Sequence, residues 1–236
     1  MNDNASKSVP PSVQEVSLPV VGTDQRFPVR RIYCVGRNYV SHIREMAEAD
    51  ERDLPFFFQK PRDAIVENGD EVPYPQATEN FEFEGELVVA IGASGSDIPV
   101  DDVDKHVFGV ASGIDLTRRD LQFEARERSW PWEMGKSFDH SAPVGALTPT
   151  STLDILDNAE LTLHVDGKLR QHTSLSLMIW STREIISRLS AQFRLEPGDI
   201  VMTGTPAGVG ALGPGDRVDV AITGLEALSI TVTSKA

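Results

Sequence analysis

The stretch Glu84-Gly-Glu-Leu-Val-Val-Ala-Ile-Gly92 is the clearest structural signal in the sequence. Its apolar run, residues 87–91, is short, contains β-branched residues and ends at a glycine, which is typical of a buried β-strand. Alternate side chains of a strand share one face, so Glu84 and Glu86 would project together from its start. The stretch therefore predicts a core strand that carries two acidic groups at one end.

Short apolar runs separated by glycine and proline recur on both sides of this strand. They predict further strands at residues 31–35, 106–114, 161–165, 200–203, 218–222 and 227–232. Helical spacing or charge predicts only a few helices, at residues 39–49, 117–128 and 176–193. Many short strands and few helices indicate a β-rich α+β fold, not a doubly wound sheet.

The composition excludes several classes of protein. Lys and Arg number 22 against 36 Asp and Glu, and the net charge of −14 argues against a nucleic-acid partner. The single cysteine, Cys34, excludes an internal disulfide and a cysteine-rich zinc site, and it fits a reducing compartment. Residues 1–11 lack the apolar segment of a secretory signal, and no apolar run is long enough to cross a bilayer. We therefore expect a cytoplasmic protein with no membrane partner.

The acidic strand start has two interpretations. Two carboxylates held close together are costly unless a cation neutralises them, and carboxylate oxygens suit Mg²⁺, Mn²⁺ or Ca²⁺. A solvated strand edge is the commoner interpretation of such a pair, and Glu82 extends the same face. Asp115 follows another predicted strand and precedes a predicted helix, so it is either a third ligand or a helix N-cap.

Three further segments could carry chemistry. His42 and Glu45 are neighbours on a helix, so the carboxylate could orient the imidazole as a general base, or the two could form an exposed ion pair. Lys136 is either partly buried beside an anion or lies on the surface against Trp132. The glycine-rich residues 203–210 could offer backbone N–H groups to an anion, or form an ordinary loop.

The order of these segments resembles the fumarylacetoacetate hydrolase family over about residues 30–236. The motifs that carry the resemblance are Tyr33-Cys-Val-Gly-Arg-Asn-Tyr-Val-Ser-His-Ile-Arg-Glu45, Phe58-Gln-Lys-Pro61, Phe83-Glu-Gly-Glu-Leu-Val-Val-Ala-Ile-Gly92, Asp115-Leu-Thr-Arg-Arg-Asp-Leu-Gln122, Gly135-Lys-Ser-Phe138 and Thr203-Gly-Thr-Pro-Ala-Gly-Val-Gly210. The resemblance implies a mixed β-sandwich roll at residues 31–236 with a few short helices, preceded by an arm with short strands at residues 1–30. It also implies a homodimer that binds one Mg²⁺ or Mn²⁺ per chain.

The resemblance assigns a role to each candidate residue. The implied metal ligands are Glu84, Glu86 and Asp115. The implied catalytic residues are His42 and Glu45, a water-activating dyad on a lid segment, and Lys136, which binds anions beside the metal. The implied substrate contacts are Arg119, Gln122, Gly204 and Thr205. Members of the family cleave C–C bonds in 1,3-diketo acids, and some decarboxylate or isomerise related keto acids.

Residues 54–61 and 136–143 look most like the fumarylpyruvate hydrolases, which release fumarate and pyruvate in gentisate breakdown. The expected function is therefore metal-dependent hydrolysis of an acylpyruvate. The alternatives are oxaloacetate decarboxylation or keto–enol isomerisation at the same site, and a binding protein that has lost catalysis. Two positions depart from the family pattern. Many members have a histidine where this chain has Glu82, and a bulky residue where this chain has Gly85. A flexible glycine there would loosen the metal strand.

Overall fold

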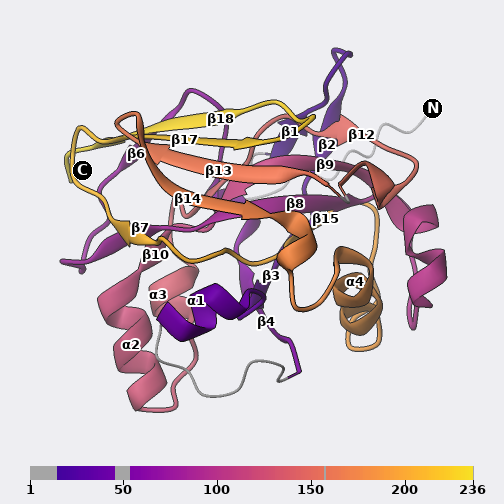
Figure 1. Ribbon diagram of the computed structural model, residues 1–236, viewed down its shortest axis with the longest axis horizontal. Coiled ribbons are helices and arrows are strands. Elements are labelled where there is room, and N and C mark those ends of the chain that lie inside the picture. The colour runs from indigo at the N-terminus through magenta and orange to yellow at the C-terminus, as the bar shows by residue number, and fades with distance from the viewer. Residues whose placement is uncertain (1–14, 46–53, 157, 236) are drawn as a thin grey trace, which may run out of the picture.

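The computed structural model describes residues 15–45, 54–156 and 158–235 (Figure 1). Its larger sheet has six strands, in the order β12-β9-β8-β15-β3-β4. These strands are β12 (Thr148–Pro149), β9 (Val107–Ile114), β8 (Gly85–Ile91), β15 (Asp199–Met202), β3 (Arg31–Gly36) and β4 (Phe56–Lys60). The core strand predicted within residues 84–92 is thus confirmed as β8, and it lies in the interior of the sheet.

A second sheet of five strands faces the first (Figure 1). Its strands, in spatial order, are β14 (Lys168–Ser174), β13 (Glu160–Val165), β17 (Arg217–Ile222), β18 (Leu228–Thr233) and β6 (Glu71–Pro73). Leu87 and Val89 of β8 belong to one buried cluster with Leu161, Leu163 and Val220 of this sheet. The main core therefore lies between the two sheets, as in a β-sandwich.

The opposite face of β8 is covered as well. Val88 and Ala90 belong to a second buried cluster together with Leu18 of β1 (Ser17–Pro19) and Phe27 of β2 (Arg26–Pro28). A strand that is buried on both faces carries apolar residues at every position, not at alternate ones. This double burial explains the continuous apolar run of residues 87–91.

Besides the antiparallel pair of β1 and β2, the described residues form two small sheets. One has the order β10-β7-β16, formed by β10 (Thr117–Arg118), β7 (Phe81–Phe83) and β16 (Gly210–Ala211). The other pairs β11 (Ala142–Pro143) with β5 (Ile65–Val66) in parallel. The first of these sheets matters for function, because it joins the start of β8, the start of helix α2 and the glycine-rich loop.

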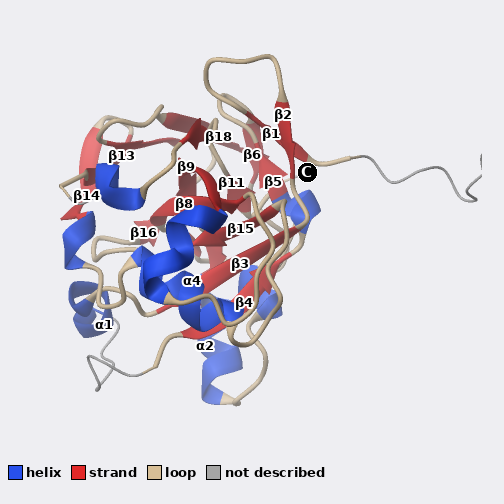
Figure 2. Cartoon of the chain, turned by 90° about the vertical axis from the view of Figure 1, so that its right-hand side faces the viewer, coloured by secondary structure: helices blue, strands red, loops and turns tan. Residues whose placement is uncertain are grey.

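Helices in the described residues are short and lie at the periphery (Figure 2). They are α1 (Val40–Glu45), α2 (Arg119–Glu127), α3 (Glu133–Lys136) and α4 (Thr182–Ser190), with 3-10 helices at Arg62–Ala64, Val100–His106, Leu153–Leu156 and Leu175–Leu177. The predicted helix at 39–49 is present to Glu45, and residues 46–49 lie outside the described residues.

Two helix predictions were wrong at their starts. The helix predicted at 117–128 begins at Arg119, because residues 117 and 118 pair with β7 instead. The helix predicted at 176–193 begins at Thr182, because Ser181 and Glu184 form a capping box there. The β-rich α+β fold with few short helices is confirmed. Within the described ranges, no helix has the length and apolar character needed to span a membrane.

Candidate metal centre

Three carboxylates converge where β8 and β9 meet. Glu84 precedes β8, Glu86 lies within it, and Asp115 follows β9, with Asp115 N donating to Glu84 O at 2.8 Å. One carboxylate oxygen from each side chain lies within 4.8 Å of the other two. All three residues are buried, so they are not a solvated strand edge. Nor does Asp115 cap a helix, since the N-cap of α2 is Arg118.

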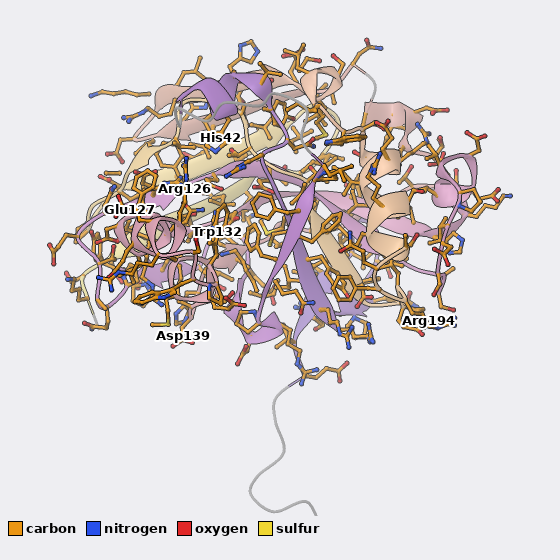
Figure 3. All side chains as sticks on the ribbon, turned by 90° about the horizontal axis from the view of Figure 1, so that it is seen from below. His42, Arg126, Glu127, Trp132, Asp139 and Arg194 are labelled. Carbon is orange, nitrogen blue, oxygen red and sulfur yellow. The ribbon has the colours of Figure 1, made fainter. Side chains whose placement is uncertain are left out.

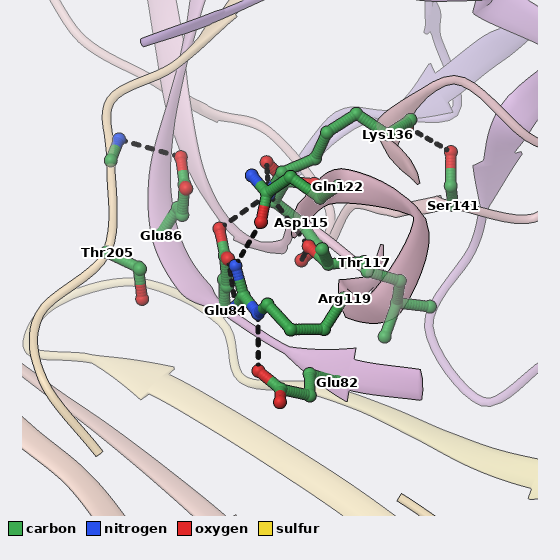
Figure 4. A network of polar contacts seen from close by, with 12 residues as sticks. Glu82, Glu84, Glu86, Asp115, Thr117, Arg119, Gln122, Lys136, Ser141 and Thr205 are labelled. Atoms are coloured by element: carbon green, nitrogen blue, oxygen red, sulfur yellow. Dashed lines mark hydrogen bonds and ion pairs between the residues drawn. The ribbon is translucent and has the colours of Figure 1, made fainter. Parts of the chain in front are cut away.

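Two buried lysines partly neutralise this cluster. Lys136 Nζ lies 2.8 Å from Glu84 Oε2 and 2.8 Å from Asp115 Oδ2, and it donates to Thr117 Oγ1 at 2.7 Å (Figure 4). Only 2% of Lys136 is exposed, which rules out the alternative of a surface lysine. Lys60 Nζ lies 2.8 Å from Asp115 Oδ1, and it also donates to the backbone carbonyls of residues 116 and 136.

Arg119 neutralises the remaining acidic groups on one side of the cluster. Its guanidinium donates to Glu84 Oε1 at 2.5 Å and to Glu82 Oε2 at 2.7 Å (Figure 4). Its third nitrogen donates to Gln122 Oε1 at 2.5 Å. The negative charge of Glu82, which the sequence left unexplained, is therefore balanced by Arg119.

The pKa values of Glu84 and Glu86 are shifted in opposite directions. Burial alone would raise the pKa of Glu84, but the charges of Lys136 and Arg119 outweigh it and lower that pKa well below its ordinary value. Burial raises the pKa of Glu86 well above its ordinary value, and the carboxylates of Asp115 and Glu84 raise it further. Glu86 is therefore the member of the cluster whose charge most lacks compensation.

The donor set fits a hard divalent cation. Each member offers a carboxylate oxygen, the ligand type that Mg²⁺ and Mn²⁺ prefer. Asp115 Oδ1 accepts no hydrogen bond, even though Lys60 is close, and Glu86 lacks a cationic partner among the described side chains. A divalent ion would supply the positive charge that Glu86 lacks and a partner for Asp115 Oδ1.

The glycine-rich loop at residues 203–210 is part of the site. Gly204 N donates to Glu86 Oε2 at 2.7 Å, and Thr205 Oγ1 donates to Gly85 O at 2.9 Å. Gly204 has a φ of +98°, and a Cβ there would lie 2.7 Å from the Cβ of Asn38. The loop therefore needs a glycine at this position, and its backbone N–H orients a carboxylate of the cluster.

A pocket lies over the cluster. Glu84 and Asp115 line its floor, and Glu86 belongs to the same carboxylate cluster. Its other lining residues are Val35, Gly36, Arg37, His42, Phe58, Arg119, Gln122, Phe123, Arg126, Trp132, Lys136 and Thr205. His42, Arg126 and Trp132 lie near one another on the side of the protein that carries α1 and α2 (Figure 3). The structure thus brings every candidate side chain that it describes to one place.

One candidate lies beyond this description. The backbone of Glu45 ends α1, three residues after His42, but its side chain is outside the described residues. Conversely, Lys60 and Gln171 belong to the site and were given no role from sequence. Lys60 lies in the quoted motif Phe58-Gln-Lys-Pro61, which was a usable signal, whereas the sequence around Gln171 offers none.

A family model gives the decisive comparison, because the fumarylacetoacetate (FAA) hydrolase C-terminal model matches residues 31–233. The chain belongs to the fumarylacetoacetate hydrolase family. Within this family it is 38% identical to a fumarylpyruvate hydrolase of Ralstonia sp over 177 residues, 75% of this chain and 92% of the relative. It is also 38% identical to the mitochondrial oxaloacetate tautomerase FAHD1 of Homo sapiens over 203 residues, 86% of this chain and 91% of the relative.

A solved member of the family has nearly the same fold. The crystal structure of fumarylpyruvate hydrolase from Pseudomonas aeruginosa, in complex with Mn²⁺ and pyruvate, superposes with a TM-score of 0.93. The two chains are 49% identical, and the match covers 97% of this chain and all of that one. The predicted resemblance to fumarylpyruvate hydrolases of this family is therefore confirmed.

Proposed function

We propose that this protein is a metal-dependent hydrolase that cleaves the C–C bond of an acylpyruvate, with fumarylpyruvate as substrate and fumarate and pyruvate as products. The observation that carries the proposal is the shared pocket, in which His42 lies over the cluster of buried carboxylates. The likeness to the Mn²⁺-bound and pyruvate-bound hydrolase supports Mn²⁺ or Mg²⁺ as the cofactor and a 2-keto acid as the ligand.

Glu84, Glu86 and Asp115 would hold the ion. When bound, it supplies a Lewis acid that polarises a keto oxygen and stabilises the charge of a departing enolate. Lys136 and Arg119 lower the pKa of the Glu84 carboxyl and so would keep it ionised for a cation. Gly204 N holds the second carboxylate, Glu86, in place through its hydrogen bond.

The residues above the floor would bind the substrate and move protons. We assign Arg119, Gln122, Gly204 and Thr205 to the keto-acid end. His42 takes a proton from water at a ring nitrogen while the water oxygen bonds to the distal carbonyl carbon. The C–C bond then breaks, its electron pair passes to the pyruvate enolate, and the proton returns from His42 to the enolate carbon. Glu45 is proposed to orient His42 from the same helix.

One alternative function has a specific observation in its favour. The chain is as similar in identity to oxaloacetate tautomerases as to the Ralstonia hydrolase. Proton transfer between the carbon and oxygen of an enol needs the same pocket but no attack by water. Either activity is compatible with a homodimer, which the family resemblance implies, and with the cytoplasmic location expected from the composition.

A product assay separates the two functions. The protein would be incubated with fumarylpyruvate, acetylpyruvate and the enol form of oxaloacetate, each with Mn²⁺, with Mg²⁺ and with a chelator. Hydrolysis predicts metal-dependent release of one pyruvate per fumarylpyruvate consumed. If no acylpyruvate released pyruvate while oxaloacetate tautomerised rapidly, the hydrolase proposal would be wrong and the alternative correct.

A further inference from the structure

Gln171, in the second sheet, makes three hydrogen bonds to the two segments that build the metal centre. It lies in β14 and is 1% exposed. Its Oε1 accepts from Gly85 N at 2.9 Å, and its Nε2 donates to Thr205 Oγ1 at 2.9 Å and to Pro206 O at 2.9 Å. One amide thus joins the strand of the metal ligands to the loop that carries Thr205.

The partners of this amide fix its orientation. Gly85 N can only donate, so it must face the amide oxygen, and Pro206 O can only accept, so it must face the amide nitrogen. The nitrogen therefore also donates to Thr205 Oγ1, and the hydroxyl hydrogen of Thr205 has to point elsewhere. It points to Gly85 O at 2.9 Å, so the single hydroxyl hydrogen of Thr205 is already used and this oxygen can only accept from any other partner.

Gly85 is what allows Gln171 to approach the strand so closely. A Cβ at Gly85 would lie 3.1 Å from Gln171 Oε1 and 3.0 Å from Leu163 Cδ1. Because successive residues of a strand face opposite sides, Glu84 and Glu86 project away from Gln171. Gly85 does not loosen this strand, since side chains bind both its N–H and its carbonyl oxygen.

The loop is also packed tightly against β14. Gly208 has a φ of +96°, and a Cβ there would lie 2.1 Å from the carbonyl oxygen of Arg170. The loop backbone can therefore lie directly on the strand that carries Gln171. A shift of Gln171 would therefore displace Thr205 and Gly85. Because Gly85 lies between them in the strand, Glu84 and Glu86 would move with it.

We propose that Gln171 is a positioning residue with two roles. It holds the ligand strand against the loop, which keeps Glu84 and Glu86 in register for the metal. It also keeps the Thr205 hydroxyl donating to Gly85 O, which fixes the loop segment that lines the substrate pocket. The second role rests on the proposed function, whereas the first concerns the metal alone.

Two substitutions separate these roles, and a third serves as the control. Gln171→Met keeps the length of the side chain and removes every hydrogen bond. Gln171→Glu keeps an acceptor for Gly85 N but replaces the donor to Thr205 by an acceptor, which captures the threonine hydrogen. Thr173→Val is the control, because Thr173 is buried two residues along the same strand and its hydroxyl donates to Ser174 O instead.

The readouts are the Kd for Mn²⁺ by calorimetry without substrate, the steady-state constants for fumarylpyruvate, and thermal unfolding. Gln171→Met should weaken Mn²⁺ binding about tenfold, in the range of residues that orient metal ligands. Gln171→Glu should bind Mn²⁺ no more weakly than wild type, yet raise KM about tenfold with a smaller change in kcat. Thr173→Val should leave the Kd and KM unchanged.

The outcomes distinguish this inference from the proposed function. If both Gln171 variants kept the Mn²⁺ Kd and the KM within about twofold of the Thr173→Val control, Gln171 would be a packing residue only and the inference would be wrong. The Mn²⁺ titration needs no turnover, so it tests the first role even if fumarylpyruvate proves not to be the substrate. If Gln171→Met does not fold, the KM of Gln171→Glu decides the second role.

Discussion

The floor and the rim of the pocket are built in opposite ways. The carboxylate floor (Glu84, Glu86 and Asp115) is buried at the junction of two core strands, and each carboxylate has fixed protein partners. The α1 rim (Val40–Glu45) is a helix of six residues in which Ser41 is exposed and His42 is only partly buried. A helix this short is not stable alone and depends on packing.

This difference indicates that metal binding and proton transfer depend on different parts of the pocket. The floor is ordered by the core of the protein, so its geometry for a metal ion exists before any ligand binds. The rim carries the imidazole that would move the proton, and it can be altered without disturbing the core. Metal binding and turnover should therefore be separable by substitution, which is the comparison that the following predictions test.

The largest effect is expected in the floor, from Asp115→Asn. This change keeps the volume of the side chain but removes the charge that Lys60 and Lys136 now balance and one of the three oxygen donors. The Mn²⁺ Kd should rise by at least about 100-fold, and metal-dependent activity should be lost with it. Calorimetry and a Mn²⁺-dependent rate assay measure the two.

A second buried aspartate provides the control for Asp115→Asn. Asp199 is fully buried in β15 and forms an ion pair with Arg30 at 2.9 Å, outside the metal centre. Asp199→Asn should lower the free energy of unfolding but leave the Mn²⁺ Kd unchanged. Equal loss of Mn²⁺ binding in both variants would mean that general destabilisation, and not a lost ligand, explains the result.

The next effect belongs to the rim. His42→Ala should reduce hydrolysis by about 10²–10⁴-fold, the usual contribution of a general base. The Mn²⁺ Kd should change by less than about threefold, because the imidazole is not in the carboxylate cluster. Ser41→Ala, at the exposed neighbour, removes only a long acceptor contact, 3.5 Å from Ala207 N, and should change both quantities far less than His42→Ala does. Full turnover by His42→Ala on every acylpyruvate tested would refute the assignment of His42 as the base.

A smaller effect is expected from pH. Burial and the neighbouring carboxylates raise the pKa of Glu86, so below that pKa the folded protein holds a proton that the metal must displace. Mn²⁺ affinity should therefore rise with pH, by up to about tenfold per unit, until Glu86 ionises. Titrations in two buffers of different ionisation enthalpy should show about one proton released per ion. A Kd that is independent of pH, with no proton released, would contradict this electrostatic account.

The same pKa predicts the stability of the metal-free protein. Between the unfolded and the folded pKa of Glu86, the folded state binds more protons than the unfolded state. The contribution of Glu86 to the free energy of unfolding should therefore fall as the pH rises through this window. Saturating Mn²⁺ should remove that contribution, since it replaces the proton. Thermal unfolding with and without Mn²⁺ measures the difference.

The floor was more predictable from sequence than its surroundings, for a physical reason. Strand alternation is a local property, so the spacing of Glu84 and Glu86 was enough to place them on one face. The burial of both, and the cations that permit it, could not be derived locally. Lys60 reaches Asp115 across the sheet, and Gln171 reaches Gly85 from the other sheet.

The predictions from sequence failed where a local signal competes with packing or capping, at the start of α4 and at Gly85. Helical spacing continued back to residue 176, but the capping box at Ser181 starts the helix later. Gly85 was expected to loosen the metal strand, but side chains bind both its N–H and its carbonyl oxygen, and a Cβ there would lie only 3.1 Å from Gln171 Oε1. Local propensity alone does not report which segment of the fold packs against a glycine.

The smallest expected effect lies at the edge of the floor, in Glu82→Gln. Its carboxylate binds Arg119 and accepts from Asn80 Nδ2 at 3.1 Å, and the glutamine keeps an oxygen for either donor. Loss of one partly solvated charge should weaken Mn²⁺ binding by less than about fivefold. The KM for the keto acid should fall slightly, because Arg119 is then less neutralised. If Glu82→Gln instead removed Mn²⁺ binding as completely as Asp115→Asn, Glu82 would be a ligand itself. The floor would then extend onto β7, and the assignment of three carboxylates would have to change.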